Sequence, residues 1–583
     1  EVSLVRDNSI YQTQKIAAVG GIIGIFAGKD EKNALKETAS GNVSDIIMEG
    51  TVQAVLPDSS ADEPQNYAYG IGGIAGYAKM QSDADAARFL NCTNHADVTG
   101  NLMTGGIVGN LDSHFTYKST LTDQELESLA NIKDGSNDGL IVCSAEASEN
   151  TIRGKYFGGI AGYAEQSLIC GAVSASGRAE GFTFSEDKKE EYLKGKYVGG
   201  IVGYGNSTLV NNCSTETDGY VLGSEYVGGI VGGLGRNVSE AIRADSVVAV
   251  TTNGSYIIGN RYVGGIAGEN QGGVTLKNCI NNGVAAGYDR YVGGIVGYND
   301  YQATIYDCAS YLSDYDNSIF RMIVDTWNAK GDYAGGIAGY NNGNIILTKD
   351  SEAITVKSVS GIVVGRNYVG GIAGFNDVNG ELDVHYTLIG GRIYAYGDCA
   401  GGGFGFNASE KLLTQELTIK PRSINGRCCV GGCIGANAVE LTSDITMDQF
   451  RADNVLATIS GKAFCGGIIG YQRTYTKADL PGISADGSIR EAVEEMQRRT
   501  AKRLLPGIEA DTNIPQSVKE SANSHALTIE TAGNSAVSLK TETNNVPIQA
   551  GMYAGGIVGY CEKNSKLIIR NCKNAGRLQN HIT

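Results

Sequence analysis

The sequence of 583 residues predicts an all-β fold, an elongated β-solenoid (parallel β-helix) of about fourteen GGIxG rungs with short helical insertions. Three observations predict it. A GGIxG phrase recurs along the chain, short runs rich in β-branched residues lie between its copies, and glycine is abundant (82 residues) while proline is scarce (7 residues). Collagen would need glycine at every third position, and a disordered chain would lack the apolar content of 42%.

The repeat is exact at two positions of the phrase. The fifth position is glycine in all fourteen copies, and the third is isoleucine in twelve, with Gly403 and Cys433 as the exceptions. The shortest spacings, 29 to 31 residues, suit one turn of a solenoid. The first glycines of the copies are Gly20, Gly72, Gly105, Gly158, Gly199, Gly228, Gly264, Gly293, Gly335, Gly370, Gly401, Gly431, Gly466 and Gly555.

Each copy reads as about three short strands. The phrase YVGGIxGYN is one predicted strand, and segments such as TLKNCINNGVAAG (275–287) read as two more, separated by a polar turn. Both alternating faces of the YVGGIxGYN strand are apolar. Two explanations stay open: the chain bends at the glycines, or a second layer covers the strand.

Stacked rungs place equivalent residues above one another, which predicts several ladders. The glycines allow close rung-to-rung approach, the tyrosines two positions before the glycine pair stack, and asparagines after the phrase pair through their amides. The ladder isoleucines and glycines are Ile230, Ile266, Ile295, Ile337, Ile372, Gly268, Gly297, Gly339 and Gly374. The asparagines are Asn270, Asn299, Asn341, Asn376, Asn407 and Asn437.

Long gaps between copies predict inserted segments. We expect solenoid repeats with insertions over 1–471, an inserted helix-containing segment over 472–552, and a final repeat over 553–583. Capping-box spacing predicts helices from Thr122 and from Ser488, and a more polar third helix is expected near 185.

The phrase YVGGIVGYN, followed by strands around NCxNxG, resembles the GLUG-motif repeat region of large bacterial surface and secreted proteins. Such repeats occur in adhesins and in the non-catalytic part of immunoglobulin-A metalloproteases. The resemblance implies a β-solenoid and an extracellular location, at a bacterial cell surface or secreted. It carries no catalytic residue.

Charge argues against several partners. A net charge of -16 opposes binding to nucleic acid or anionic lipid through a basic patch, and no apolar run reaches the length of a spanning helix. The first ten residues lack the features of a signal peptide and the end lacks a recognisable anchor, so we expect a mature or excised segment of something longer. The expected partners are a host protein or glycan and other parts of the same surface protein.

Motifs for catalysis and cofactors are missing from the sequence. Five histidines are scattered without HExxH, neither GxSxG nor a P-loop occurs, and GGxxG differs in spacing from a calcium β-roll. We therefore predict no catalytic, cofactor-binding or metal residue. Four cysteines should cluster, namely Cys399, Cys429, Cys433 and Cys465, with Cys428 adjacent. Buried thiols are favoured, with disulfides or a cysteine-only metal site as alternatives.

Three functions fit this sequence. The first is a non-catalytic extracellular stalk or adhesin segment that presents a surface for attachment to host or glycan ligands. The others are a glycan-binding or polysaccharide-degrading β-helix and the repeat arm of a secreted protease.

Overall fold

The computed structural model divides the chain into two compact units, unit 1 (Glu1–Leu312) and unit 2 (Ser313–Thr583), which are treated separately below. The expected helices near 185 and from Ser488 lie outside the described residues. The structure describes residues 2–3, 16–27, 39, 41–56, 68–80, 87–115, 118–144, 147–148, 151–152, 154–174, 195–216, 219–235, 247–249, 251–310, 322–324, 332–347, 362–384, 387–388, 392–397, 399–414, 417–419, 421, 423–438, 442–443, 445–447, 458–472, 536–540, 543–544, 548–550, 553–561, 566–570, 573–574 and 578–580.

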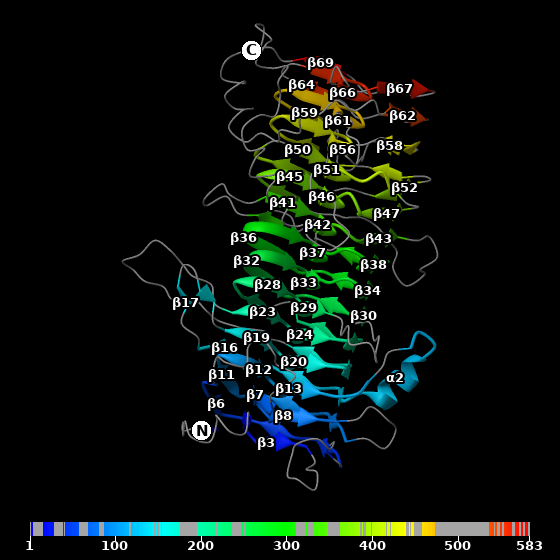
Figure 1. Cartoon of the computed structure of the whole chain (residues 1–583). Coiled ribbons are helices and arrows are strands. Elements are labelled where there is room, and N and C mark those ends of the chain that lie inside the picture. Colours follow the sequence, from blue (N-terminus) through cyan, green and yellow to red (C-terminus); the bar gives the residue numbers. More distant parts are fainter. Residues whose placement is uncertain are drawn as a thin grey trace. The chain divides into compact units, whose positions relative to one another are not determined.

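Both units are parallel β-solenoids, as the repeat predicts. One turn, called a rung below, is clearest from Tyr256. The chain runs through β32 (Tyr256–Gly264), β33 (Ala267–Asn270), β34 (Thr275–Lys277) and β35 (Ile280–Asn281), and the next rung starts at β36. Each strand pairs in parallel with its equivalent one rung later, so four sheets, called sheets 1 to 4 in chain order, wind around the unit (Figure 1).

The strands of unit 1 follow this order. Sheet 1 contains β2 (Ile16–Gly20), β7 (Ala68–Gly72), β12 (Leu102–Gly105), β19 (Lys155–Gly158), β23 (Lys196–Gly199), β27 (Tyr220–Leu222), β28 (Glu225–Gly228), β32 and β36 (Val284–Gly293). Sheet 2 contains β3 (Ile23–Phe26), β8 (Ala75–Lys79), β13 (Val108–Asp112), β20 (Ala161–Glu165), β24 (Val202–Asn206), β29 (Val231–Gly235), β33 and β37 (Val296–Asn299). Sheet 3 contains β4 (Val43–Ser44), β9 (Phe89–Leu90), β14 (Ile132–Lys133), β21 (Leu168–Cys170), β25 (Leu209–Asn211), β30 (Val247–Ala249), β34 and β38 (Thr304–Tyr306). Sheet 4 contains β5 (Ile47–Met48), β10 (Thr93–Asn94), β15 (Ser136–Asn137), β22 (Val173–Ser174), β26 (Ser214–Thr215), β31 (Thr252–Asn253), β35 and β39 (Ala309–Ser310). A short sheet of β1 (Val2–Ser3), β6 (Thr51–Gln53), β11 (Asp97–Gly100) and β16 (Ile141–Cys143) and a hairpin of β17 (Ala147–Ser148) and β18 (Thr151–Ile152) complete the unit.

Unit 2 repeats the pattern. Its sheet 1 contains β40 (Met322–Val324), β41 (Asp332–Gly335), β44 (Ile362–Gly365), β45 (Asn367–Gly370), β49 (Arg392–Ala395), β50 (Cys399–Gly401), β54 (Ser423–Asn425), β55 (Cys429–Gly431), β59 (Thr458–Gly461), β60 (Phe464–Gly466), β64 (Ile548–Ala550), β65 (Tyr553–Gly555) and β69 (Leu578–Asn580). Sheet 2 contains β42 (Ala338–Asn341), β46 (Ala373–Asn376), β51 (Phe404–Asn407), β56 (Ile434–Asn437), β61 (Ile469–Gln472) and β66 (Val558–Cys561). The remaining strands are β43 (Asn344–Leu347), β47 (Glu381–Val384), β52 (Leu412–Thr414), β48 (Thr387–Leu388), β53 (Leu417–Ile419), β58 (Ile445–Met447), β63 (Thr543–Asn544), β68 (Lys573–Asn574), β57 (Thr442–Ser443), β62 (Ala536–Lys540) and β67 (Lys566–Arg570). Three strands of unit 2 fall within 472–552, the segment that the sequence predicts as an insertion: β62, β63 and, in sheet 1, β64.

The expectation of a single YVGGIxGYN strand is wrong. The second glycine and the isoleucine form a corner, so the phrase ends one strand and begins another, and a rung has at least four strands rather than three. In the rung from Tyr256, β32 ends at Gly264 and β33 begins at Ala267. The sequence pattern missed this corner because residues on both sides of it are buried and therefore apolar.

Two structural features explain why both faces of the YVGGIxGYN segment are buried. The tyrosine before the glycine pair has a positive φ, 57° in Tyr262, which turns the strand locally and interrupts its alternation. The strands on either side of the corner then pack against each other. A Cβ atom on Gly268 would lie 2.5 Å from the carbonyl carbon of Tyr226 in the preceding rung. The bend and the covering layer, the two explanations left open by the sequence, are thus both present.

The helix expected from Thr122 is confirmed as α2 (Asp123–Leu129). The Thr122 hydroxyl accepts from the backbone N–H of Glu125, and the Glu125 carboxylate accepts from the backbone N–H of Thr122, which completes the capping box. Leu126 packs with Phe115 and Leu168 in a small apolar cluster at β21, so this insertion covers part of sheet 3 (Figure 1).

Candidate functional site

The five ladder isoleucines all lie at the corner after the glycine pair. In unit 1 the backbone N–H of Ile230 donates to the carbonyl of Ile266 at 3.0 Å, and Ile266 donates to Ile295 at 2.9 Å. In unit 2 Ile337 donates to Ile372 at 2.9 Å. All five side chains are buried. They fill the interior of the rungs and offer nothing to a ligand.

The ladder glycines belong to sheet 2, where they face the strand before the corner. A Cβ atom on Gly297 would lie 2.6 Å from the backbone nitrogen of Val263, and one on Gly374 would lie 2.7 Å from that of Ala334. Gly268 makes the same approach, and Gly339 occupies the equivalent position of β42. These glycines allow backbone to pack on backbone, which excludes a phosphate-binding role for the phrase.

Tyrosines form a buried double stack. The rings of Tyr226, Tyr262 and Tyr291 are nearly parallel, with centroids 4.5 Å and 4.8 Å apart, and Tyr298 in sheet 2 meets Tyr291 edge to face. Tyr226, Tyr262 and Tyr291 are all buried. Because their faces are covered, these rings stabilise the stack and are not a platform for sugars.

Asparagine amides form two buried ladders. In sheet 2 of unit 2, Asn341 donates to Asn376 at 2.8 Å, and Asn376 donates to Asn407 at 2.9 Å. The chain of amides ends at Asn437, which donates to the Oε1 atom of Gln472. In unit 1 Asn270 donates to Asn299, and a second ladder, unpredicted by us, runs through Asn253 and Asn281 in sheet 4.

The starts of these ladders explain two unsatisfied oxygens. Asn94 starts a further pair in sheet 4 by donating to Asn137 at 2.8 Å. The Oδ1 atoms of Asn94 and Asn270 are buried and have no hydrogen-bond partner. The preceding rung places Met48 beside Asn94 and Leu234 beside Asn270, and neither side chain can donate a hydrogen bond. These two oxygens therefore belong to the first amide of each ladder, and their lack of a partner does not imply a ligand.

The structure brings part of the predicted cysteine cluster together. Cys399 and Cys429 pair in register, and the Sγ atoms of Cys429 and Cys428 lie 3.7 Å apart. Cys465 lies on the next strand, β60, beside Val430. Cys433 replaces the isoleucine of its GGIxG phrase and lies next to Gly403, the equivalent residue of the preceding rung. All five are buried, and the structure has no disulfide between them.

Their surroundings keep these thiols protonated. Hydrogen bonds with the thiols of Cys399 and Cys428, together with burial, raise the pKa of Cys429 well above its usual value. Burial, together with the neighbouring Cys428, raises the pKa of Cys465. Among the residues that the structure describes, no group of three or more His, Cys, Asp or Glu side chains could hold a metal ion. Buried, protonated thiols of this kind pack like small apolar side chains.

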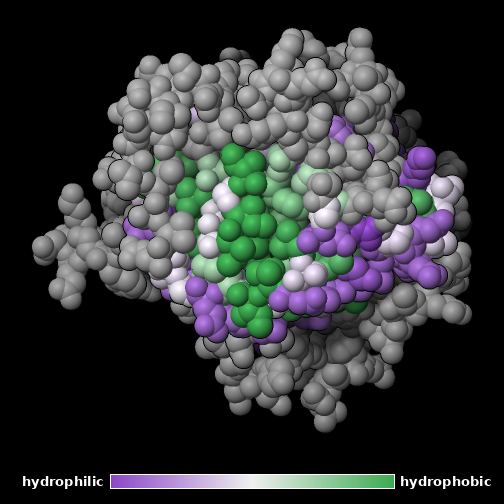
Figure 2. Space-filling model, turned by 90° about the horizontal axis from the view of Figure 1, so that it is seen from below, coloured by the Kyte–Doolittle hydropathy of each residue, from purple (hydrophilic) through white to green (hydrophobic). Residues whose placement is uncertain are grey.

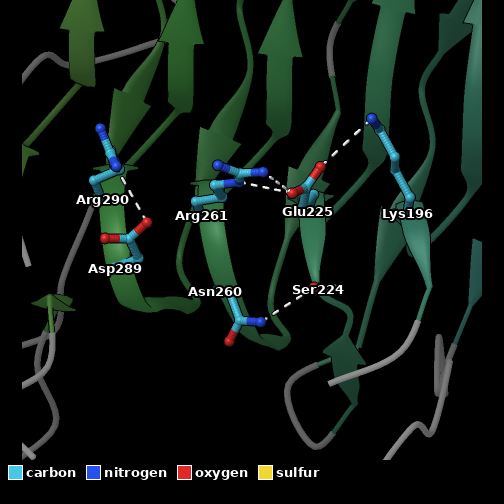
Figure 3. A network of polar contacts seen from close by, with 7 residues as sticks. All are labelled: Lys196, Ser224, Glu225, Asn260, Arg261, Asp289 and Arg290. Atoms are coloured by element: carbon cyan, nitrogen blue, oxygen red, sulfur yellow. Dashed lines mark hydrogen bonds and ion pairs between the residues drawn. The ribbon is translucent and has the colours of Figure 1, made fainter. Parts of the chain in front are cut away.

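A row of charged side chains lies beside the tyrosine stack. The residue before each stacked tyrosine is Lys196, Glu225, Arg261 or Arg290 in successive rungs, and these residues are neighbours in register. The Glu225 carboxylate pairs with Lys196 at 3.4 Å and with Arg261, whose Nε donates to it at 2.7 Å (Figure 3). Arg290 pairs with Asp289.

The basic groups also cover aromatic faces. The Nζ atom of Lys196 lies 5.0 Å from the ring centroid of Tyr226, and the guanidinium of Arg290 lies 5.8 Å from that of Tyr291. Adding Lys155, which pairs in register with Lys196, gives four basic side chains against two acidic ones, Glu225 and Asp289. The row is therefore locally basic on a chain of net charge -16.

An exposed aromatic pair belongs to the same sheet. Tyr220 of β27 is 38% exposed, and its ring stacks on half-buried Tyr256 with centroids 5.3 Å apart. Strand β32 continues from Tyr256 to Arg261 in the charged row, and β28, which contains Glu225, follows β27. The cationic-aromatic face, defined as Lys196, Tyr220, Tyr256, Arg261 and Arg290, is the strongest candidate for a binding surface in unit 1.

Sequence analysis did not predict this face. Its signal is present in the phrases KYV, EYV and RYV, where a charged residue precedes the tyrosine in Lys196, Glu225, Arg261 and Arg290. The pair Tyr220 and Tyr256 lies outside the repeated phrase, so only the register of the strands reveals that the two rings stack.

One buried acid lies in unit 2. Burial raises the pKa of Asp377 to about 6, although Tyr340 donates to its Oδ2 at 2.7 Å and the backbone of Val378 donates to its Oδ1. The Asp377 carboxyl group is therefore partly protonated near pH 6. Its two hydrogen bonds, to Tyr340 and Val378, do not connect it to a second acid or a nucleophile.

Comparison of the chain with protein-family models, with curated proteins and with solved structures finds no match. In the part of the chain that the structure describes, no helix has the length and apolar character needed to cross a membrane.

Proposed function

We propose that the chain is a non-catalytic, extracellular β-solenoid segment of a bacterial cell-surface or secreted protein, which acts as a stalk or adhesin segment. The observation that carries this proposal is the use of the repeated residues. Isoleucines, glycines, tyrosines and asparagines of the phrase are buried and pair with their equivalents in the next rung. A repeat whose side chains are committed to stacking serves to build a rigid scaffold.

The attachment surface in this proposal is the cationic-aromatic face. The stacked rings of exposed Tyr220 and half-buried Tyr256 suit the apolar faces of sugars, and the guanidinium groups of Arg261 and Arg290 suit carboxylate or sulfate groups. The net charge of the face is opposite to that of the rest of the chain. This combination favours an acidic glycan of the host as the ligand.

A glycan array followed by a release assay tests this proposal. We expect binding to uronic-acid or sulfated glycans, at least about tenfold weaker in the Tyr220→Ala/Tyr256→Ala double variant. Tyr301→Ala is the matched control, because Tyr301 is 51% exposed in a turn outside the face. Release of reducing ends from any polysaccharide would overturn the non-catalytic assignment, and unchanged binding by the double variant would overturn the assignment of the face.

A further inference from the structure

Three neighbouring strands in unit 2 expose outward side chains that the repeated phrase does not use. The strands β49, β54 and β59 of sheet 1 pair in parallel, with β44 before them and β64 after them. All three are interior strands of the sheet. Exposure of their side chains therefore follows from the fold and not from an edge.

Polarity separates the two faces of these strands, as it does elsewhere in the solenoid. At the end of unit 1 that contains β3, hydrophobic side chains gather in the middle with hydrophilic ones beside them (Figure 2). In β49, Ile393 and Ala395 are buried, whereas Arg392, Tyr394 and, directly after the strand, Tyr396 are exposed. The outer face of this segment thus presents one cation and two aromatic rings.

Register places outward residues of the three strands in two rows. In the first row, Tyr394 lies beside Asn425 of β54, and Asn425 lies beside Ser460 of β59. Asn425 and Ser460 are both half-buried. This row offers an aromatic ring, an amide and a hydroxyl group on adjacent rungs, about 4.8 Å apart.

The second row is cationic and begins at Tyr396. The backbone N–H of Arg427 donates to the carbonyl of Gly397, the residue after Tyr396, at 2.9 Å, and that of Lys462 donates to Arg427 at 3.0 Å. Arg427 is half-buried and Lys462 is exposed, so two basic residues occupy adjacent rungs beside an exposed ring. The two rows together, called the unit 2 face below, consist of Tyr394, Tyr396, Asn425, Arg427, Ser460 and Lys462.

None of these six residues is acidic, which distinguishes the unit 2 face from the charged row of unit 1. In that row Glu225 pairs with Arg261, and Asp289 pairs with Arg290. Within the described part of the chain, the side chains of five members of the unit 2 face form no hydrogen bond, ion pair or aromatic contact, namely Tyr394, Tyr396, Asn425, Ser460 and Lys462. The face is therefore a basic surface with uncommitted polar groups on a chain of net charge -16.

We propose that the unit 2 face binds a sugar that carries a phosphate monoester. Arg427 and Lys462 hold the phosphate, because a guanidinium and an ammonium group on adjacent rungs match a single group with a charge near -2. A carboxylate or a sulfate ester carries one negative charge and uses only one of the two cations. The arrangement therefore favours phosphate over both.

The remaining residues of the face suit the sugar. Tyr394 is 40% exposed and Tyr396 is 60% exposed, so both rings can pack on the apolar face of a sugar. Sugar hydroxyl groups donate and accept hydrogen bonds, as the side chains of Asn425 and Ser460 also do. A free phosphate ion would leave this row unused. The inference goes beyond the proposed function and does not depend on the cationic-aromatic face of unit 1.

Calorimetric titration with glucose 6-phosphate tests the proposal on the Tyr220→Ala/Tyr256→Ala chain, which lacks the ring pair of unit 1. We expect an affinity at least about tenfold higher than that for glucose 6-sulfate, glucuronate or inorganic phosphate. Equal affinity for inorganic phosphate would show a simple anion site. Tighter binding of a single-stranded oligonucleotide would show a nucleic-acid site. Either result overturns the proposal, and neither bears on glycan binding by unit 1.

The pH dependence of binding separates phosphate from sulfate. A phosphate monoester gains its second negative charge as the pH rises through about 6. The affinity for glucose 6-phosphate should therefore increase at least about threefold between about pH 5 and pH 7.5. The same titrations with glucose 6-sulfate report any change in the protein itself and should be flat. Parallel profiles for the two ligands would contradict binding of the phosphate by two cations.

Lys462→Gln tests the phosphate contact without disturbing the interior, because Lys462 is exposed. This variant should bind glucose 6-phosphate and inorganic phosphate at least about tenfold more weakly, and Lys462→Arg should restore most of the affinity. Arg392→Gln is the matched control, because it removes an exposed cation of β49 that lies about 13 Å along the strand from Tyr396. Equal losses in Lys462→Gln and Arg392→Gln would show a general charge effect and overturn the proposal.

Tyr396→Ala tests the sugar contact separately from the phosphate contact. Loss of this exposed ring should weaken binding of glucose 6-phosphate several-fold and leave binding of inorganic phosphate unchanged. The circular dichroism spectrum should stay that of the wild type, because the side chain is 60% exposed. Unchanged binding of glucose 6-phosphate by a folded Tyr396→Ala chain would contradict the placement of the sugar on this face.

Discussion

The carbonyl carbon of Tyr226 lies 2.5 Å from the point that a Cβ atom on Gly268 would occupy, one rung further along the chain. No side chain fits there, so two strands on either side of a corner approach backbone to backbone. The repeated fifth glycine therefore determines how closely sheets 1 and 2 pack. This contact, rather than the binding of a ligand, explains the most invariant position of the repeat.

Gly297→Ala should destabilise unit 1 strongly. Its Cβ atom would lie 2.6 Å from both the carbonyl carbon of Tyr262 and the nitrogen of Val263, and backbone atoms cannot rotate away as a side chain can. We expect a loss of about 1–3 kcal/mol, measured by chemical denaturation. Gly24→Ala is the control, because a Cβ atom on Gly24 would meet only the carbonyl oxygen of Ala18, at 3.5 Å. Equal stability of the two variants would contradict the packing of sheets 1 and 2.

Tyr262→Val should be more harmful than loss of one ring contact suggests. Tyr262 stacks on Tyr226 and Tyr291, and its φ of 57° is unfavourable for a β-branched residue. We expect a loss of about 3–5 kcal/mol. Tyr256→Val in the same strand should cost less, because Tyr256 is half-buried and has no left-handed φ. The comparison is made by thermal melting.

Asn407→Leu should break the amide ladder of unit 2. The substitution leaves the Asn376 amide nitrogen without its acceptor at 2.9 Å and the Asn437 oxygen without its donor at 2.8 Å. Two buried polar groups without partners should cost about 2–6 kcal/mol together. A Leu variant as stable as the wild type in urea denaturation would show that the amides do not form a continuous ladder.

Asp377 should make unit 2 less stable as the pH rises from about 4 to 6. Its folded pKa is raised to about 6 from an ordinary value of 3.8, so the folded chain holds more protons than the unfolded chain across this window. The stability contribution is full below pH 3.8 and is lost as the pH passes 6. Asp377→Asn should therefore raise the free energy of unfolding by about 3 kcal/mol at pH 8 and by little at pH 4.

Buried thiols should resist alkylation in the folded protein. Cys399, Cys429 and Cys465 are buried, and the pKa values of Cys429 and Cys465 are raised, so little thiolate forms at pH 7. Cys561 is half-buried at the last rung and should react first among the described cysteines. Peptide mapping after iodoacetamide treatment measures this order. Rapid labelling of Cys429 in the native chain would contradict its burial.

Periodicity in the sequence was enough to predict the β-solenoid, because residues at equivalent positions share one environment in every rung. The asparagine ladder follows directly from that reasoning, and Asn376 and Asn407 pair as the alignment implies. The direction in which the chain bends did not follow. Tyr262 and Gly264 are apolar neighbours in a buried phrase, and burial on both faces hides the corner between strands.

The candidate binding face could not be predicted from the sequence for a related reason. The repeat identifies residues that are the same in every rung, whereas Tyr220 and Tyr256 belong to positions that vary between rungs. Only the register of β27 and β32 places these rings together. In a repeat protein, binding specificity comes from residues that differ between rungs. An alignment on the shared phrase compares only the residues that the rungs have in common.

In-register stacking is the central claim, and Thr275 and Thr304 test it most directly. These residues are 29 positions apart in the sequence, but they pair in adjacent parallel strands and are both half-buried. Spin-labelled unnatural amino acids at both positions should lie about 5 Å apart at the backbone and give a strongly broadened electron paramagnetic resonance spectrum. A spectrum equal to the sum of the two singly labelled proteins would contradict the stacking of these rungs.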